Sequence, residues 1–382
     1  MELYIHIPYC RQKCRYCDFA SYAGQDGTME AYVEALLREA AAMAPLAAGA
    51  PIQTVFIGGG TPSTLPAPLL KKLLEGLHVY FNIPACVEFT SEANPGTLTP
   101  DWLETAVSGG VNRISMGMQA AQPELLGRLG RIHTHADVVT SAKLVRRAGI
   151  ENLSLDLMFG LPGQSPDMWR ESLYAALAVG TEHMSCYGLI PEDGTPLKND
   201  LDAGRLSLPS EDDERLMYDD TLRILSQHGY EHYEISNFAK PGRACQHNIG
   251  YWMRVPYIGL GASAASFLTS SSGGLRLTNP SGIREYISMT EAQAWRRRER
   301  TSLLPEDARF ESLMLGLRMI RGVSEADFAA MHGMTLDAYC GKTLRLQEAR
   351  GLLLHRDGSW ALTRRGMDVQ NAILVEIMEA VE

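Results

Sequence analysis

Three cysteines near the start of the chain have the spacing that most clearly indicates chemistry. Cys10, Cys14 and Cys17 fall within eight positions, whereas the other four cysteines lie far apart. Structural zinc sites take four ligands, commonly in two separated pairs, and here no fourth cysteine follows, since Phe19 occupies the position after next. Three thiolates suit a four-iron cluster that leaves one iron open to an exogenous ligand. The alternatives are three buried thiols or an incomplete zinc site.

The motif Cys-x3-Cys-x2-Cys, placed directly after a predicted first strand, resembles the radical S-adenosylmethionine (SAM) superfamily. Members of that superfamily bind SAM through the fourth iron of a 4Fe-4S cluster and cleave it to a 5′-deoxyadenosyl radical. The resemblance implies a partial (β/α)6 TIM-like barrel. The longer run Tyr4–Cys10, YIHIPYC, narrows the resemblance to the oxygen-independent coproporphyrinogen III oxidase-like branch.

A glycine-rich segment, Gly58–Pro62, follows the second predicted strand. Adjacent glycines let the backbone approach a ligand closely and leave amide N–H groups for a carboxylate, although a lone triplet is usually a turn. By the resemblance, this segment and Tyr4 contact the methionyl part of SAM, and Glu92 accepts a hydrogen bond from the SAM amino group. The residues that the resemblance assigns to SAM are Tyr4, Gly59, Gly60, Thr61 and Glu92.

Three further polar residues lie at or after the ends of the fourth and fifth predicted strands. They are Gln119, Arg131 and Asp156. In relatives that bind two SAM molecules, the matching positions contact the second one. Arg131 is suited to pairing with a carboxylate, and Asp156 to accepting from a hydroxyl or an ammonium group. The alternative for each is a structural salt bridge or a strand-end cap.

The segment Gln246–Trp252, QHNIGYW, places an imidazole, an amide and two large rings close together. A neutral imidazole can ligate haem iron and aromatic rings can cover a flat macrocycle, although a histidine beside aromatic residues is more often a packing residue. Together with Phe19 in place of an extra cysteine, this HNxxYW motif resembles the HemW-type haem chaperones, which bind haem and pass it to acceptor proteins. The resemblance implies His247 as the axial haem ligand, with the pocket residues Asn248, Tyr251 and Trp252.

The resemblance leaves competing functions open. One is the oxidative decarboxylation of coproporphyrinogen III to protoporphyrinogen IX in porphyrin biosynthesis. Another is a radical methyltransferase that uses two SAM molecules, which the presence of Gln119, Arg131 and Asp156 favours. Whether the chain is an enzyme is therefore undecided. The cofactors expected in the leading interpretation are a 4Fe-4S cluster, SAM and haem; the expected partner is a haem-acceptor protein, and the open iron could also promote a homodimer.

The elements that must position these residues alternate between strands and helices up to about residue 190. Six such units predict a parallel sheet, doubly wound or barrel-like, with function at the carboxyl ends of the strands. The predicted strands are Leu3–Pro8, Thr54–Gly58, Cys86–Ala93, Arg113–Met118, Asn152–Gly160 and His183–Ile190. The predicted helices are Met29–Ala42, Leu69–Tyr80, Pro100–Ser108, Ala136–Ala148 and Pro166–Ala178.

We expect three domains: residues 1–200 as the barrel core, 201–295 as an α+β extension with the HNxxYW motif, and 296–382 as a helical, winged-helix-like domain. The extension is predicted to contain a helix at Glu211–His228 and a strand at Tyr230–Ala239. In the last domain, Gly351–Leu354 and Trp360–Thr363 surround an Asp-Gly turn, which is typical of a hairpin. Residues 301–382 carry nine basic and twelve acidic side chains, so nucleic-acid binding is not expected.

Composition limits the remaining classes of protein. The chain has 382 residues, 45% hydrophobic and 21% charged, which is typical of a folded protein. Its net charge of −10 gives no general electrostatic support for binding nucleic acid or an anionic membrane. No apolar run approaches ~18 residues, so no membrane-spanning helix is expected. The first ten residues lack signal-peptide features. A cytoplasmic protein is predicted, for which peripheral membrane contact stays possible.

Overall fold

A curved sheet organises the chain, and a computed structural model describes it for residues 1–270 and 273–381. Within those ranges the sheet has twelve strands in the order β12-β11-β10-β9-β1-β2-β3-β4-β5-β6-β8-β7, and β1 to β6 are parallel. The six parallel strands are β1 (Glu2–Ile7), β2 (Thr54–Gly59), β3 (Glu88–Ala93), β4 (Arg113–Gln119), β5 (Asn152–Phe159) and β6 (His183–Gly188). The sheet does not close on itself, because β12 and β7 are its edges. The predicted partial barrel is confirmed.

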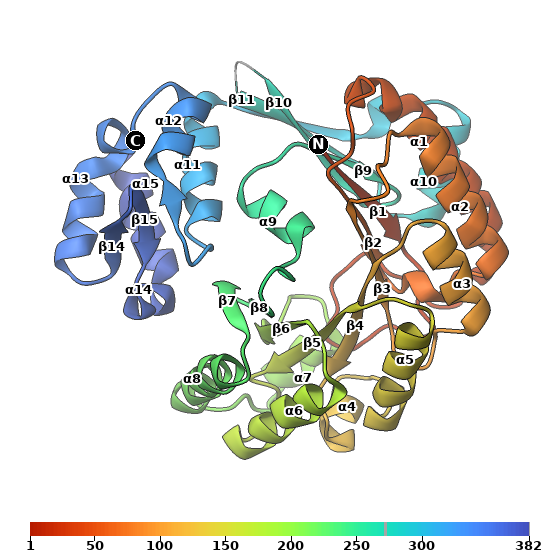
Figure 1. The fold of residues 1–382 in the computed structure, drawn as a ribbon, viewed down its shortest axis with the longest axis horizontal. Helices are drawn as coiled ribbons and strands as arrows, with labels where there is room; N and C mark the ends of the chain where they lie inside the picture. The colour runs from red at the N-terminus through yellow and green to blue at the C-terminus, as the bar shows by residue number, and fades with distance from the viewer. Residues whose placement is uncertain (271–272, 382) are drawn as a thin grey trace.

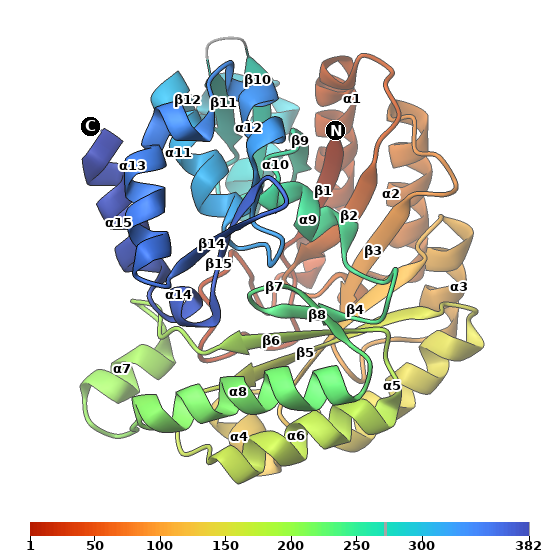
Figure 2. The same cartoon turned by 60° about the vertical axis from the view of Figure 1, so that its left-hand side comes forward.

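Helices follow the parallel strands and cover the outer side of the sheet, as Figures 1 and 2 show. They are α1 (Met29–Ala47), α2 (Ala67–Tyr80), α3 (Pro100–Ser108), α4 (Pro123–Arg128), α5 (His135–Arg147) and α6 (Pro166–Val179). The six predicted strands and five predicted helices are all present, and all their ends lie within two residues of the predicted ones except the end of the first helix. The first helix is longer than predicted and ends only after Ala47, with Pro45 tolerated in its last turn. Helix α4 was not predicted.

Side chains of the parallel strands alternate between two faces. Leu3, Ile5 and Ile7 of β1 belong to the hydrophobic core that includes residues of α1 and α2. The intervening positions point to the inner face, where Tyr4 bonds to His6. On the other parallel strands, the positions aligned with Tyr4 also face inward, and most of them carry polar side chains. These are Thr54, Glu88, Thr90, Glu92, Arg113, Ser115, Ser154, Asp156, His183 and Ser185. The interior of the partial barrel is therefore polar and able to surround a polar ligand.

The chain then extends the sheet on both sides. The additional elements are α7 (Pro196–Asp202), α8 (Glu211–Gln227), β7 (Glu231–Glu234), β8 (Asn237–Ala239), α9 (Gln246–Trp252), β9 (Tyr257–Leu260), β10 (Ala265–Ser270), β11 (Gly273–Thr278), α10 (Ile283–Glu291) and β12 (Glu299–Leu303). The prediction of one strand at Tyr230–Ala239 was wrong, since β7 and β8 form an antiparallel hairpin. The Glu234 carboxylate accepts the backbone N–H of Ser236 at 3.0 Å, which stabilises the turn between the two strands.

The last part of the chain has a hydrophobic core of its own, which includes Leu313, Phe328, Leu344, Trp360 and Ile373. Its helices are α11 (Pro305–Gly316), α12 (Glu325–His332), α13 (Leu336–Ala349), α14 (Arg364–Asp368) and α15 (Gln370–Val381). A small sheet has the order β13-β15-β14, from β13 (Val323–Ser324), β15 (Ser359–Leu362) and β14 (Leu353–Arg356). The predicted Asp-Gly turn joins β14 to β15, with positive φ values of 51° and 72° at its two residues. This arrangement agrees with the predicted winged-helix-like architecture.

Helix α9, which carries the HNxxYW motif, lies between the inner face of the sheet and the C-terminal part of the chain (Figure 1). It contacts β2 on one side and α11 on the other. Across the described ranges, no helix has both the length and the hydropathy that a membrane span requires.

Candidate functional site

Cys10, Cys14 and Cys17 lie on the loop between β1 and α1, here called the cysteine loop (residues 10–17), and all three are partly exposed. The loop is held from several directions. The Cys10 thiol lies 3.4 Å from Oγ1 of Thr61, and the Arg15 backbone N–H donates to the carbonyl of Leu129 at 2.9 Å. The three thiols are thus held at the carboxyl ends of the parallel strands, where function was expected.

The thiols of the cysteine loop fit a four-iron cluster by chemistry and position. Burial raises the pKa of the Cys10 and Cys17 thiols, so iron must displace their protons before they ligate. In the described ranges, no three His, Cys, Asp or Glu side chains are gathered around a single-ion position. A four-iron cluster binds each thiolate through a different iron, so it needs three thiols around a common space rather than around one ion.

The glycine segment at the end of β2, Gly58–Pro62, is tightly packed against the end of β1. A Cβ atom at Gly59, where φ is +110°, would lie 2.6 Å from the His6 ring. The amide N–H groups of this segment already have protein acceptors: Gly59 donates to Glu92 Oε2 at 3.1 Å, Gly60 to the Ile7 carbonyl and Thr61 to the Tyr9 carbonyl. The expectation that these amides are free for a ligand carboxylate was therefore wrong. The glycines are needed because the two strand ends approach each other closely.

Glu92 lies on the inner face of β3 beside that segment. Burial, and next the nearby charge of Asp156, raise the pKa of the Glu92 carboxyl to about 8. Burial raises the pKa of the Tyr4 phenol, and the nearby charge of Glu92 raises it further. The Tyr4 hydroxyl lies 3.0 Å from Nδ1 of His6, whose Nε2 lies 2.9 Å from the Ala20 carbonyl just after the cysteine loop. The predicted SAM residues therefore connect directly to the segment that holds the cysteines.

Arg131 brings the cysteine loop and β4 together. Its Nη1 donates to Sγ of Cys14 at 3.4 Å, and its Nη2 donates to Oδ1 of Asn94 at 2.9 Å and to the Gly117 carbonyl at 2.6 Å. Asn94 in turn donates to Oγ1 of Thr61 at 2.8 Å. A pocket of about 210 Å³ opens here, lined by Cys14, Thr61, Asn94 and Arg131 among others. Because the half-buried guanidinium of Arg131 lines it, this pocket is suited to an anionic group.

Gln119 and Asp156 lie on neighbouring strands of the same interior. Gln119 has a φ of 64° at a bulge where the pairing of β4 with β5 shifts. The Asp156 carboxylate accepts from the Ser115 hydroxyl at 3.1 Å, and burial raises the pKa of its carboxyl. Gly117 leaves room for the side chains of Gln119 and Arg131, since a Cβ there would lie 2.7 Å from each. These polar groups are near one another, as predicted; what they bind stays a prediction.

Sequence reasoning missed two residues of this interior, Asn94 and Tyr16. Asn94 lies two positions after Glu92, and it links Arg131 to Thr61. Tyr16 lies inside the cysteine loop, and burial raises the pKa of its phenol although Arg131 is close. The position of Asn94 in the SEANPGT segment was the available signal for it. Tyr16 stands between Cys14 and Cys17, and nothing in the sequence there indicated which way its side chain faces.

His247 does not fit the role of haem ligand in this structure. It is 1% exposed, and both ring nitrogens have partners: Nδ1 lies 2.7 Å from Oγ1 of Thr54 and Nε2 lies 3.0 Å from the Tyr251 hydroxyl. Its ring stacks on Phe56 with centroids 5.1 Å apart. Burial lowers the pKa of the imidazole to about 3, so the ring is neutral. His247 and Tyr251, one helical turn apart, thus face the barrel interior.

Glu2 and Glu88 fix the orientation of α9. Glu88 accepts the backbone N–H groups of Gln246 at 3.0 Å and His247 at 3.1 Å. Glu2 is buried against Gly250, where a Cβ would lie only 1.9 Å from its carboxylate. Burial raises the pKa of the Glu2 carboxyl to about 8. These contacts join the motif helix to the first residues of β1 and β3.

Trp252 lies on the other side of α9, toward the C-terminal part of the chain. The Arg318 guanidinium lies 4.3 Å from the centroid of its ring. Trp252 also lines a pocket together with residues of α11 and α12. Asn248 stands one helical turn before it and is half-buried. The four motif residues are therefore divided between two sides of α9, and one flat ligand in the present arrangement does not contact them all.

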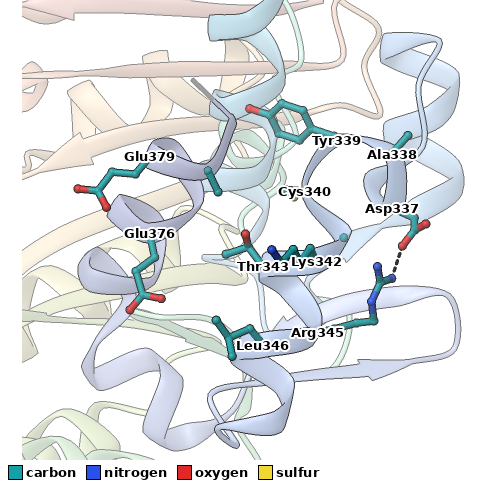
Figure 3. A pocket seen from close by; sticks show the side chains of 12 residues that line it. Asp337, Ala338, Tyr339, Cys340, Lys342, Thr343, Arg345, Leu346, Glu376 and Glu379 are labelled. Carbon is teal, nitrogen blue, oxygen red and sulfur yellow. Dashed lines mark hydrogen bonds and ion pairs between the residues drawn. The ribbon is translucent and has the colours of Figure 1, made fainter.

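A wide hollow of about 950 Å³ between α13 and α15 is separate from these residues (Figure 3). Its walls carry charged side chains, including the ion pair between Asp337 and Arg345 that is drawn there. None of the site residues predicted from the sequence lines it. The hollow is therefore not part of the candidate site.

Two family descriptions match the chain. The radical SAM superfamily matches residues 4–174, which begin at Tyr4, include the cysteine loop and end within α6. The HemN C-terminal domain matches residues 303–369, from the end of β12 to just after α14.

Curated relatives are similar to the chain over nearly its full length. The protein described as "Heme chaperone HemW" from Bacillus subtilis (strain 168) is 37% identical over 371 residues, or 97% of this chain and 97% of that protein. Its namesake from Escherichia coli (strain K12) is 36% identical, covering 98% of this chain and 97% of that protein. The solved structure of coproporphyrinogen III oxidase (HemN) from Escherichia coli, described as a radical SAM enzyme, has a TM-score of 0.83 at 22% identity, covering 98% and 89% of the two chains. That likeness shows the fold.

Proposed function

This chain belongs to the HemW family of haem chaperones within the radical SAM superfamily, and from that premise we propose that it binds haem and delivers it to an acceptor protein in the cytoplasm. The observation that carries the proposal is the length of the match. A relative named as a haem chaperone aligns with 97% of this chain, so the cysteine loop, α9 and the C-terminal part all lie within the shared region.

The barrel core, residues 1–200, is proposed to hold the 4Fe-4S cluster and SAM. When bound, the cluster supplies an iron that can ligate SAM and an electron that can reduce it. Cys10, Cys14 and Cys17 are the cluster ligands in this proposal, and Arg131 orients the Cys14 sulfur. The Glu92 carboxylate accepts from the SAM ammonium group, a charge-assisted hydrogen bond in a buried setting.

The remaining predicted residues complete the proposed SAM region. Tyr4 and the segment of Gly59, Gly60 and Thr61 form the wall beside Glu92. Gln119 and Asp156 offer acceptors at the ends of β4 and β5, where a hydroxyl or a second ammonium group could bind. Cluster-dependent pairing of two copies is a further expectation, which size-exclusion chromatography of reconstituted and cluster-free protein tests directly.

Haem is the cargo in this proposal, and residues 201–382 are the part of the chain that we assign to it. The expected ligand His247 is unavailable in the present arrangement, because the hydroxyls of Thr54 and Tyr251 occupy both ring nitrogens. Ligation by its Nε2 would require the Tyr251 side chain to move away. Of the other motif residues, Trp252 borders an open pocket, whereas Tyr251 and its partner histidine face the barrel.

A second candidate function, oxidation of coproporphyrinogen III, is favoured by one observation. Glu92, Arg131 and Asp156 all lie within the same polar interior as the cysteine loop, as an enzyme that cleaves SAM would require. The haem chaperone remains the leading proposal because the relatives that match the chain along its length carry that name.

Haem binding and transfer test the proposal. Anaerobically reconstituted protein should shift the Soret band of added haem and then lose that haem to a generic apo-haemoprotein such as apomyoglobin. Failure of the wild-type protein to bind haem would overturn the chaperone function. A parallel incubation with coproporphyrinogen III, SAM and a reductant should give no protoporphyrinogen, and efficient turnover would instead favour the enzyme.

A further inference from the structure

The Nε2 atom of His247 is covered by the hydroxyl of Tyr251, which lies 3.0 Å from it. The two residues are four positions apart on α9, so their side chains share one face of the helix. Their rings are closer to perpendicular than to parallel, with centroids 4.8 Å apart. The imidazole is buried, whereas the phenol is half-buried. Tyr251 is therefore the outer residue of the pair, and its hydroxyl blocks access to this nitrogen.

The other ring nitrogen of His247, Nδ1, faces oxygen atoms of the barrel. Oγ1 of Thr54, at the start of β2, lies 2.7 Å from Nδ1, and Oε2 of Glu2 lies 3.9 Å from it. This Glu2 oxygen is buried and has no hydrogen-bond partner within the described ranges. Two electronegative oxygens on one side favour a proton on Nδ1, and a neutral imidazole carries only one proton. Nε2 then keeps a lone pair, which accepts a hydrogen bond from the Tyr251 hydroxyl.

We propose that the Tyr251 hydroxyl is a built-in competitor of haem iron for Nε2 of His247, and that Thr54 positions the imidazole for both partners. The inference rests on the proposed function, since it concerns how the cargo is taken up and released. In the exchange, the hydrogen bond from Tyr251 breaks and a dative bond from Nε2 to iron forms. The proton on Nδ1 stays in place, and no electron is transferred.

A competitor on the ligand suits a protein that hands its cargo over. A buried imidazole without a partner on Nε2 would carry the cost of an unpaired polar atom, and haem binding would relieve that cost. The Tyr251 hydroxyl removes it in the haem-free protein, so the apparent affinity for haem falls and release is favoured. Glu88 holds the backbone of α9 through two N–H groups. Rotation of the Tyr251 side chain is therefore the smallest change that frees Nε2.

Haem titration of the full-length reconstituted protein tests the competition. Tyr251→Phe keeps the ring and removes the hydroxyl, so we expect about tenfold tighter haem binding. Transfer of that haem to apomyoglobin should slow by a similar factor. The matched control is Tyr257→Phe, because the Tyr257 ring packs against that of Tyr251 with centroids 4.8 Å apart, while both nitrogens of His247 have other partners. The control variant should bind and release haem like the wild type.

Two substitutions at Thr54 test its positioning role. Thr54→Val removes the acceptor for Nδ1, and loss of such a partner typically weakens metal binding by about tenfold or more. The imidazole also becomes a weaker electron donor, so the reduction potential of the bound haem should become more positive. Thr54→Ser keeps the hydroxyl and should restore both values. A merely structural role of Thr54 would not shift the potential in this way.

Two spectra check the ligand itself. In the haem-free protein, nitrogen-15 chemical shifts of His247 should show the proton on Nδ1. In the ferrous nitrosyl complex, electron paramagnetic resonance should show hyperfine splitting from an imidazole nitrogen opposite the nitric oxide. A proton on Nε2, no imidazole splitting, or Tyr251→Phe with wild-type affinity and transfer would overturn this inference while leaving the chaperone function intact. If the wild-type protein binds no haem, the proposed function fails as well.

Discussion

The guanidinium of Arg131 donates a hydrogen bond to the thiol sulfur of Cys14 over 3.4 Å. The same side chain is bonded to Asn94 and to the Gly117 carbonyl. A residue that follows α4 therefore fixes the position of a proposed cluster ligand that lies 117 positions away in the sequence. Partners of this kind orient metal ligands and tune their properties.

Removing Arg131 should weaken retention of the cluster. Arg131→Gln removes the donor to Cys14, and loss of such a partner typically lowers metal affinity by about 10-fold or more. We expect less iron and sulfide after anaerobic reconstitution and faster bleaching in air. The control is Arg128→Gln, because Arg128 lies at the end of α4 and donates to the Pro162 carbonyl at 2.7 Å, without contact to a cysteine. Equal iron content in the two variants would contradict the role assigned to Arg131.

Binding of SAM should release a proton from Glu92. The pKa of this carboxyl is raised to about 8 by burial, so at pH 7 it is mostly protonated before SAM arrives. An ammonium group beside it favours the ionised form, and the proton leaves to the buffer. Calorimetry in two buffers of different ionisation enthalpy should detect this release. Glu92→Gln should abolish the release and weaken SAM binding roughly tenfold, the equivalent of one charge-assisted hydrogen bond. Unchanged proton release in the variant would show that another group titrates.

The strands of the sheet could be predicted well because the alternation of apolar and polar residues that marks a strand is a local feature of the sequence. In the run Leu3–Ile7, alternating apolar and polar residues give one face to the helices and the other to the interior, and neighbouring strands repeat the pattern. The cysteine spacing likewise indicated the chemistry without any knowledge of the fold. Because parallel strands bring their carboxyl ends together, residues such as Glu92 and Asp156 could be placed in one site before the structure was known.

The orientation of α9 could not be predicted in the same way. His247 looked like an open ligand because it stands beside two aromatic residues, but its ring is fixed by Thr54, which is 193 positions away. Glu88, 159 positions away, accepts the backbone N–H of His247. Such contacts depend on how distant segments pack, and no local pattern contains them. The hairpin of β7 and β8 was missed for a related reason, because the buried side chain of Glu234 stabilises its turn.

Stability should fall as the pH rises, in part because of Glu2. Burial raises the pKa of this carboxyl from 4.5 to about 8, so between these values the folded protein binds more protons than the unfolded chain. The free energy of unfolding therefore decreases from pH 4.5 to pH 8, by roughly 2–5 kcal/mol from this group. Glu2→Gln should raise the melting temperature at pH 8.5 and have little effect at pH 5. The exposed control Glu104→Gln should change neither value. A Glu2→Gln variant with the pH profile of the wild type would contradict this assignment.

Arg318 should be needed to hold the C-terminal part of the chain against the barrel. Its Nη2 lies 3.2 Å from Oε2 of Glu234, a carboxylate with no exposed surface, and its guanidinium covers the Trp252 ring. Arg318→Ala leaves a buried carboxylate without its cation, which costs about 3–5 kcal/mol when no relaxation compensates. We therefore expect limited proteolysis to cleave the variant much faster between the two parts, near residues 303–305, where β12 ends and α11 begins.

Arg345→Ala is the matched control, because Arg345 pairs with Asp337 on an exposed surface of the same C-terminal part (Figure 3). Exposed pairs contribute about 0–1 kcal/mol, so this variant should be cleaved like the wild type. If Arg318→Ala and Arg345→Ala were cleaved at the same rate, the ion pair with Glu234 would not be what holds the two parts together.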